Sequence, residues 1–176
     1  KVYRAENKNV LLIRCAEHWN RKYFLSNLLK SMGHDHSGLT VAMMMEQVIE
    51  RLHAMDKPLI IMDEADKLSD QVLYFFITIY NDLEDHCGIL MCATNHLEKR
   101  IRKGLNINKK GYNEIYSRIG RKFITLNGVS SSDVYQLCIA NGIEDKSLIK
   151  DIYKDSQYDF RRVKRRIVAA KLKANN

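Results

Sequence analysis

The stretch at residues 58–66 constrains the fold of this chain more than any other. It reads Pro-Leu-Ile-Ile-Met-Asp-Glu-Ala-Asp, so that four apolar residues run directly into two adjacent carboxylates, Asp63 and Glu64. An unbroken apolar run between a proline and acids is typical of a strand buried on both faces of a parallel sheet. Such strands carry ligand sites at their carboxyl ends. The stretch therefore predicts an acidic site at one sheet edge, with a strand that merely ends in solvated acids as the alternative.

The rest of the chain predicts a parallel sheet followed by helices. Apolar runs at 10–13 and 88–94 predict two further strands, and residues 121–126 a fourth, shorter one. Helical apolar spacing occurs at 21–32, at 40–55 with Thr40 as N-cap, and after Ser69. The polar residues 1–6 are typical of the tail of a helix. Beyond residue 130 only helical patterns remain, near 133–141, 146–155 and 159–173. We therefore expect an α/β core at 1–128 and a small all-helical domain at 129–176.

The charge distribution indicates a polyanionic partner. A chain of 176 residues with a net charge of +8 is long enough for a true core. Residues 39–98 hold 11 acids and 3 bases, whereas 99–122 hold 9 bases and 1 acid, and 161–173 hold 7 bases and no acid. Blocks of one sign favour nucleic acid, although a solvated basic face has the same composition.

Residues 99–110, with Gly104 and several asparagines, predict a mobile basic loop that contacts DNA phosphates. The candidate DNA-binding residues are Lys99, Arg100, Arg102, Lys103, Lys109 and Lys110, together with Arg165 and Arg166 on the last helix.

Other classes of protein are disfavoured. No apolar run approaches the roughly 20 residues of a membrane span, and no signal-peptide pattern is visible. The four cysteines form no CxxC pair and three lie in apolar stretches, which predicts a reducing, cytoplasmic setting. The histidines at 34, 36 and 86 lack further ligands at zinc spacing, so we expect polar loop residues there.

Four motifs together resemble those of AAA+ ATPases, in the order of that superfamily. PLIIMDEADKL resembles a Walker B strand, MCATN a sensor 1 strand, YSRIGRKF an arginine-finger region, and YDFRRV the start of a sensor 2 helix. Within the superfamily the chain is most similar to the bacteriophage Mu B-type DNA transposition ATPases, including those of Mu-like prophages. The resemblance extends over nearly the whole chain and implies an AAA+ core followed by a helical lid.

The resemblance also implies roles for the residues of the Walker B and sensor 1 motifs. Asp63 would hold Mg²⁺, directly or through a water, and Glu64 would polarise the attacking water. Asn95 would hydrogen-bond that water or the γ-phosphate. A turn residue at the end of a strand is the plainer interpretation of Asn95.

Arginines in the other two motifs receive roles in the same way. Arg118, with Arg121 as a rival, would point into the active site of a neighbouring subunit and offset developing charge. Arg161 or Arg162, which the sequence does not separate, would reach the nucleotide from the lid. A surface ion pair and a plain basic helix are the respective alternatives.

One departure from the family is severe, because the sequence contains no GxxxxGK[ST]. The nearest approach, at 33–40, has Leu39 in place of the lysine and follows a helix instead of a strand. A phosphate cradle needs the lysine charge and a strand that feeds the loop. We therefore expect the chain to be the C-terminal piece of a longer protein, with the first core strand and phosphate loop upstream. Alone, it should bind nucleotide poorly or not at all.

A second family shares several short motifs with this chain. Residues 63–66 spell DEAD, 92–94 echo the SAT motif and 118–121 echo HRIGR, which together resemble a DEAD-box helicase. In that family the last motif lies in a second α/β domain, well over 100 residues beyond SAT. Here the gap is about 23 residues and only helices follow, so the spacing argues against a helicase.

The expected function is that of an AAA+ ATPase that uses ATP and Mg²⁺, assembles into an oligomer on DNA and hydrolyses ATP between subunits. A role with a transposase in choosing target DNA follows from the resemblance alone. The alternative is a non-catalytic adaptor that keeps the fold and binds DNA or a protein partner.

Overall fold

The structure, a computed structural model, describes residues 7–120 and 122–174. The chain divides into two compact units, one ending at Phe123 and the other beginning at Ile124, a few residues before the junction expected at 128–129. Residues 1–6, the expected tail of a helix, lie outside the described residues.

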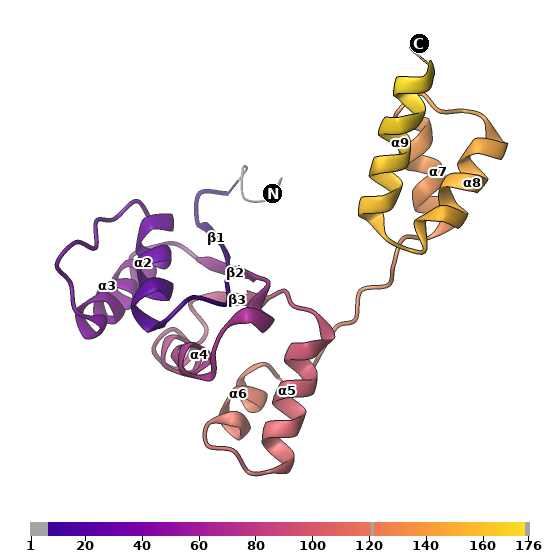
Figure 1. The fold of residues 1–176 in the computed structure, drawn as a ribbon. Coiled ribbons are helices and arrows are strands. Elements are labelled where there is room, and N and C mark those ends of the chain that lie inside the picture. Colours follow the sequence, from indigo (N-terminus) through magenta and orange to yellow (C-terminus); the bar gives the residue numbers. More distant parts are fainter. Residues whose placement is uncertain (1–6, 121, 175–176) are drawn as a thin grey trace. The chain divides into compact units, whose positions relative to one another are not determined.

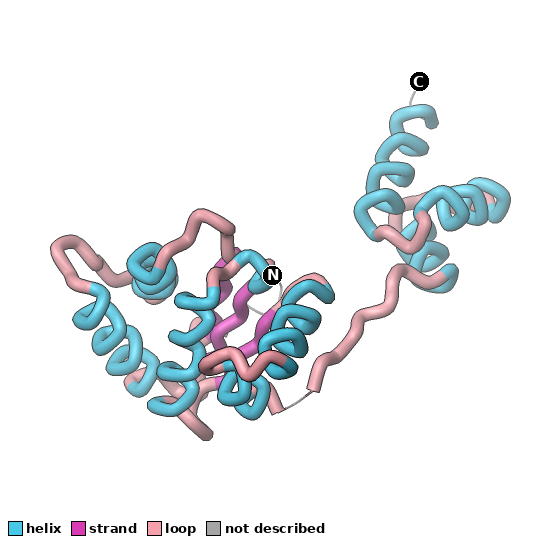
Figure 2. Tube along the Cα trace, turned by 60° about the horizontal axis from the view of Figure 1, so that its bottom comes forward, coloured by secondary structure: helices cyan, strands magenta, loops and turns pink. Residues whose placement is uncertain are grey.

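The first unit is built on a three-stranded parallel sheet in the order β1-β2-β3 (Figures 1 and 2). The strands are β1 (Val10–Arg14), β2 (Leu59–Asp63) and β3 (Gly88–Met91). Their register places Ile13 beside Met62 and Met62 beside Met91. The predicted α/β class with a parallel sheet is confirmed, and the strand that carries the two acids lies at its centre.

In the described part of the first unit, five α-helices and one 3₁₀ turn accompany the sheet. They are α2 (Arg21–Ser31), α3 (Val41–His53), α4 (Asp70–Asp82), α5 (Asn95–Asn106), α6 (Tyr112–Arg118) and the turn η1 (Ala65–Lys67). The predicted helices at 21–32, at 40–55 and after Ser69 are confirmed. Thr40 is the N-cap of α3 as predicted, because its hydroxyl accepts a hydrogen bond from the amide of Met43.

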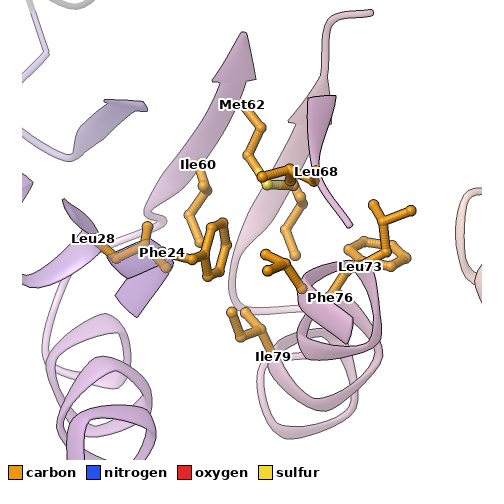
Figure 3. Close-up of a pocket in the computed structure, with 10 residues that line it drawn as sticks. Phe24, Leu28, Ile60, Met62, Leu68, Leu73, Phe76 and Ile79 are labelled. Carbon is orange, nitrogen blue, oxygen red and sulfur yellow. The ribbon is translucent and has the colours of Figure 1, made fainter. Parts of the chain in front are cut away.

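One face of the sheet forms the core with α2 and α4. Figure 3 shows Phe24 and Leu28 from α2 converging with Ile60 and Met62 of β2 and Phe76 of α4. The gap between these side chains measures only about 10 Å³ and its lining is apolar. A space of that size holds one water at most, so it reflects imperfect packing and offers no ligand site.

The opposite face of the sheet is less covered than the sequence predicted. Leu12, Ile61 and Leu90 lie side by side in the register, and Leu90 is 49% exposed. The expectation that β2 is buried on both faces therefore holds for one face only within the described residues. The far edge of β3 likewise has no strand beside it in the described part of the chain.

The expected fourth strand at 121–126 is wrong over residues 122–126, which are irregular. Arg121 lies outside the described residues. Ile124 and Leu126 are 78% and 88% exposed. The segment has the residues of a strand, but a strand also needs a neighbour whose backbone completes its hydrogen bonds, and no strand of the described residues pairs with it.

The expected mobile loop at 99–110 is wrong over residues 99–106, which belong to helix α5 (Asn95–Asn106), whereas residues 107–110 lie outside the helices. Leu97, Ile101 and Leu105 recur every four residues, and Thr94 caps the helix. The glycine that suggested a loop, Gly104, serves helix packing: a Cβ there would lie 2.2 Å from Cδ1 of Tyr112. Helix α6, which carries Tyr112, was not predicted.

The second unit is a three-helix cluster with a small core of its own. Its helices are α7 (Ser131–Ile139), α8 (Lys146–Ser156) and α9 (Phe160–Ala174), which confirms the three predicted helices. Its apolar core among the described residues consists of Val134, Cys138, Ile143, Ile149, Ile152, Val163 and Ile167. Ser130 and Asp133 form a capping box at the start of α7. None of the helices in the described ranges has the length and apolar character that a membrane crossing requires.

Candidate functional site

The ends of the three strands meet at one edge of the sheet and place charged residues there. Asp63 is the last residue of β2 and Arg14 the last of β1, and the register pairs them. Arg14 Nε lies 3.7 Å from Oδ2 of Asp63, whose side chain stays 43% exposed. The backbone around Asp63 is held on both sides, because the amide of Cys15 donates to its carbonyl at 2.8 Å and Cys92 donates to that of Met62 at 2.8 Å. The carboxylate thus projects from a rigid base.

Glu64 adopts a conformation that few residues with a side chain adopt. Its φ is +58°, in the left-handed region, and the amide of Glu64 donates to Oδ1 of Asp63 at 3.0 Å. Lys67 Nζ donates to Oε2 of Glu64 across the turn η1. This hydrogen bond holds the pKa of Glu64 below its ordinary value. Backbone strain of this kind clusters at functional sites, which supports a role for Glu64 beyond folding.

Asp66 ties the end of β2 to the start of α5. The Thr94 hydroxyl donates to Oδ2 of Asp66 at 2.9 Å, and the Thr94 amide donates to Oδ1 at 3.2 Å. Partial burial raises the pKa of Asp66, but these hydrogen bonds outweigh it and leave the pKa below its ordinary value. The link fixes where helix α5 begins relative to the acids.

Asn95, the predicted sensor 1 residue, is the first residue of α5, directly after Thr94. Its side chain is exposed and makes no hydrogen bond with the described residues. The structure thus joins the ends of β2 and β3 through Asp66 and Thr94. The predicted role of Asn95 toward a nucleotide stays a prediction.

Arg118, the predicted arginine finger, ends α6 and is engaged within its own chain. Its Nε donates to Oδ1 of Asn81 at 2.7 Å, and its NH1 lies 3.2 Å from the carbonyl of Glu114. The guanidinium also lies 6.0 Å from the ring centre of Tyr80, and the side chain is only 22% exposed. Arg118 therefore holds α6 against α4 in this structure.

The predicted sensor 2 residues belong to the second unit. Arg161 and Arg162 lie in the first turn of α9, and both are exposed. The backbone amide of Arg161 donates to Oδ1 of Asp159 at 2.8 Å, whereas the guanidinium of Arg162 donates to Oε1 of Gln157. Of the two side chains, that of Arg161 makes no hydrogen bond with the described residues, which is the first observation that distinguishes them.

The predicted DNA-binding residues of the first unit fall into two groups. Arg100 turns inward, where NH1 donates to the carbonyl of Leu68 at 2.8 Å, and its Nε lies 3.8 Å from Asp70. Arg102 pairs with Glu98 at 2.8 Å. Lys109 pairs with Asp70. These three side chains stabilise the fold.

The other three predicted residues of this stretch, Lys99, Lys103 and Lys110, have exposed side chains without a partner among the described residues. On α9, Arg165 is equally free, and Arg166 pairs with Asp155 at 3.2 Å.

An open hollow of about 520 Å³ lies at the same edge of the sheet as the acids. Residues that follow each of the three strands line it: Glu17 after β1, Asp66 and Lys67 after β2, and His96, Lys99, Arg100 and Lys103 on α5 after β3. Crevices at the carboxyl ends of parallel strands are the usual ligand sites of α/β folds. Cations outnumber acids in this lining, so the hollow suits an anion.

The acids fit one part of a magnesium–nucleotide group. Mg²⁺ takes oxygen ligands and commonly uses one or two carboxylates together with substrate phosphates, which the exposed carboxylate of Asp63 could supply. No three residues of the ligand types His, Cys, Asp and Glu cluster as a metal cage in the described part of the chain. The sequence also contains no lysine-bearing phosphate loop. The described residues therefore fit the carboxylate part of such a group, and the sequence contains no phosphate cradle for it.

Two of the residues that build this site escaped the sequence prediction. Thr94 was placed inside the third strand, although a threonine before an apolar residue repeated every four positions is a usual N-cap signal. Lys67 follows Glu64 by three residues inside a turn, where the helical spacing of ion pairs gave no guide.

Comparison with known proteins identifies a family for the greater part of the chain. The sequence model of the family described as AAA domain matches residues 1–101. That range contains all three strands, both acids and the start of α5. No curated protein matches the chain. AAA domains of this type are nucleotide-binding and ATPase-like, and the match extends over more than half of the 176 residues. This chain therefore belongs to the AAA domain family.

Proposed function

We propose that the chain is part of an AAA+ ATPase and provides the acidic half of its nucleotide-hydrolysing centre. The observation that carries the proposal is the pair Asp63 and Glu64 at the end of the central strand, with Glu64 held in a left-handed conformation. Membership in the AAA domain family supports the same assignment. Asp63 and Glu64 match the Walker B pattern residue by residue.

The proposed division of labour follows from the two carboxylates. Asp63 would hold Mg²⁺, which when bound neutralises phosphate charge. Glu64 is ionised at neutral pH, and the hydrogen bond from Lys67 lowers its pKa further below the ordinary value. An ionised carboxylate at that position can accept a hydrogen bond from water and orient it. For this, Lys67 has to share or release the oxygen that it now contacts.

We place the missing phosphate loop outside the given sequence, on a strand beside β3. Two features support this placement: the edge of β3 is unpaired among the described residues, so a further strand could pair with it, and Leu90 is exposed, so a further segment could cover it. In this arrangement the 176-residue chain alone binds nucleotide poorly. Titration calorimetry of the chain with Mg²⁺–ATP should detect no binding at millimolar nucleotide, and tight binding would contradict this placement.

The hydrolytic role is tested in the gene product that carries a GxxxxGK[ST]. Glu64→Gln should remove ATP turnover and leave ATP binding unchanged, because the amide keeps the shape of the carboxylate and loses its basicity. Glu50→Gln, at an exposed position on α3, is the matched control and should retain turnover. Unchanged turnover in Glu64→Gln would refute Glu64 as the residue that activates water.

The remaining assignments extend this proposal. DNA is the proposed polyanion, bound through its phosphates without sequence preference, and ATP is hydrolysed between subunits of an oligomer. Arg118 would act in a neighbouring subunit, which requires its contacts with Asn81 and Glu114 to open. The second unit would be the lid, with Arg161 or Arg162 as sensor 2. A transposase partner and a role in selecting target DNA rest on the resemblance to Mu B-type ATPases.

A non-catalytic adaptor is the second candidate, and two observations favour it. The sequence lacks the phosphate-loop lysine, and the carboxylate of Glu64 is already occupied by Lys67. The adaptor would keep the fold and bind DNA or a protein. The upstream gene sequence separates the candidates, because a phosphate loop there supports the ATPase and its absence or loss supports the adaptor.

A further inference from the structure

The basic residues of the first unit differ in whether their charge is available to a partner. Arg100, Arg102 and Lys109 are committed to carbonyls or carboxylates of the chain. Lys99 and Lys103 are exposed and have no partner among the described residues. They stand four residues apart on α5, and His96 precedes Lys99 by three, so all three lie along one side of the helix. We call His96, Lys99 and Lys103 the α5 cationic face.

The α5 cationic face forms one wall of the open hollow of about 520 Å³. Lys67 and Arg100 add two further cations, and the acids in the lining are Glu17 and Asp66. Asp66 is already bonded to Thr94, and its negative charge faces the start of a helix. Lys67 and Arg100 are already paired with Glu64 and Asp70, so the lining cations that have no partner among the described residues are Lys99 and Lys103.

The shape of the face fits a chain of phosphates better than a single one. Lys99 and Lys103 are separated by about 6 Å along the helix axis, and His96 and Lys103 by about 10 Å, at 1.5 Å per residue. One strand of DNA carries a phosphate about every 3.4 Å of duplex axis, so a face about 10 Å long can reach more than one phosphate. The apolar side of α5, with Leu97 and Ile101, is buried in the unit. Helix α5 therefore has no exposed apolar side that could insert into a membrane surface.

We propose that the α5 cationic face is the place where this unit contacts the phosphate backbone of DNA, with Lys99 and Lys103 as the two principal contacts. This inference rests on the proposed DNA binding and adds the site. The sequence alone did not distinguish the basic residues of 99–110. In this proposal Lys99 and Lys103 bind phosphate, whereas Arg102 and Lys109 pair with carboxylates of the chain.

The test is the salt dependence of DNA binding by the full chain. Fluorescence anisotropy with a labelled 30-base-pair duplex, in a KCl series from about 0.05 to 0.3 M, gives the slope of log K against log salt. Each lost phosphate contact lowers that slope by about 0.9. Lys99→Gln/Lys103→Gln should therefore lower it by about 1.8 and weaken binding roughly 60-fold at 0.1 M salt.

Two matched variants make the result specific. Lys146→Gln/Lys150→Gln removes the same charge at the same spacing from exposed positions of α8 and should leave the slope unchanged. Arg102→Gln, which removes a cation already paired with Glu98, should also leave it unchanged. Fluorescence of Trp19, in the core of the first unit, checks that each variant is folded.

Each outcome decides between the two levels of the proposal. If wild type binds DNA and the Lys99/Lys103 variant keeps the wild-type slope, the site is wrong and DNA binding stands. If wild type shows no salt-dependent binding, both the site and the proposed DNA binding fall. If the same two substitutions, made in the gene product that carries a GxxxxGK[ST], lower affinity for Mg²⁺–ATP while the DNA slope is unchanged, the hollow serves a nucleotide and the DNA site is refuted.

Discussion

Replacing Gly104 by alanine should destabilise the first unit, although the same change stabilises most helices. Gly104 lies inside α5, where alanine is favoured over glycine by about 1 kcal/mol. Here a Cβ would lie 2.2, 2.4 and 2.7 Å from three ring carbons of Tyr112. That ring is 1% exposed, and its hydroxyl donates to Oδ1 of Asp70 at 2.6 Å, so it has no free space to move into. Overpacking of this kind costs about 1–3 kcal/mol.

Because the three contacts are so short, we expect an overpacking cost of about 3 kcal/mol, near the upper end of that range. The helix preference of alanine offsets about 1 kcal/mol of it, so Gly104→Ala should lower the free energy of unfolding by about 2 kcal/mol. Urea unfolding followed by fluorescence is the assay, because Trp19 is the single tryptophan and is 8% exposed in the core of this unit. In a Tyr112→Leu background the loss should shrink, since the flat ring is gone. A Gly104→Ala protein more stable than wild type would refute the packing of α6 against α5, and with it the placement of the α5 cationic face.

Two further predictions concern the same unit. Asp70→Asn should cost about 1.5–3 kcal/mol at pH 7, because hydrogen bonds from Lys109 and Tyr112 end on a partly buried carboxylate. Burial raises the pKa of Asp70, but these hydrogen bonds outweigh burial and leave the pKa below its ordinary value. The stability difference between wild type and Asp70→Asn should therefore be full above about pH 5 and fade as pH falls below about 4. Urea midpoints between pH 3 and 7 measure this difference, and a pH-independent difference would contradict the ion pair. Thiol labelling of the native protein at pH 8 should modify Cys92 first, because Cys92 is exposed, whereas Cys15 is buried and its pKa is raised to about 12 by burial. Mass spectrometry of peptides identifies the labelled cysteine. Early labelling of Cys15 would contradict the packing at the end of β1.

The strands and the acidic edge followed from short-range sequence features. An apolar run such as Leu59–Asp63 has few alternatives to a central strand, and parallel neighbours bring strand ends to one edge. The placement of Asp63 and Glu64 at that edge was therefore predictable. The fourth strand was not, because residues 122–126 have strand-forming side chains but pairing depends on a neighbour.

Helix α5 shows how a local signal can be misjudged. Gly104 and the asparagines favoured a loop, and the spacing of Leu97 and Ile101 favoured a helix. The segment forms a helix, and the glycine is accommodated in it because the ring of Tyr112, eight residues later, packs in the space that a side chain at residue 104 would occupy. The contact between Gly104 and Tyr112 forms only when α6 packs against α5, so it could not be predicted from the local sequence.

The charge of a segment and the availability of that charge are different quantities, and only the first can be counted from a sequence. Lys99 and Arg100 are adjacent, equally basic and both in the lining of the open hollow, yet Arg100 donates to the carbonyl of Leu68 while Lys99 has no partner among the described residues. A helix turns about 100° per residue, so neighbours necessarily face different surroundings. Variants of Arg100 thus test folding, because they leave carbonyls of the turn after β2 unpaired, and variants of Lys99 test binding. Treating the stretch as one basic patch would mix the two effects and make a loss of DNA affinity impossible to interpret.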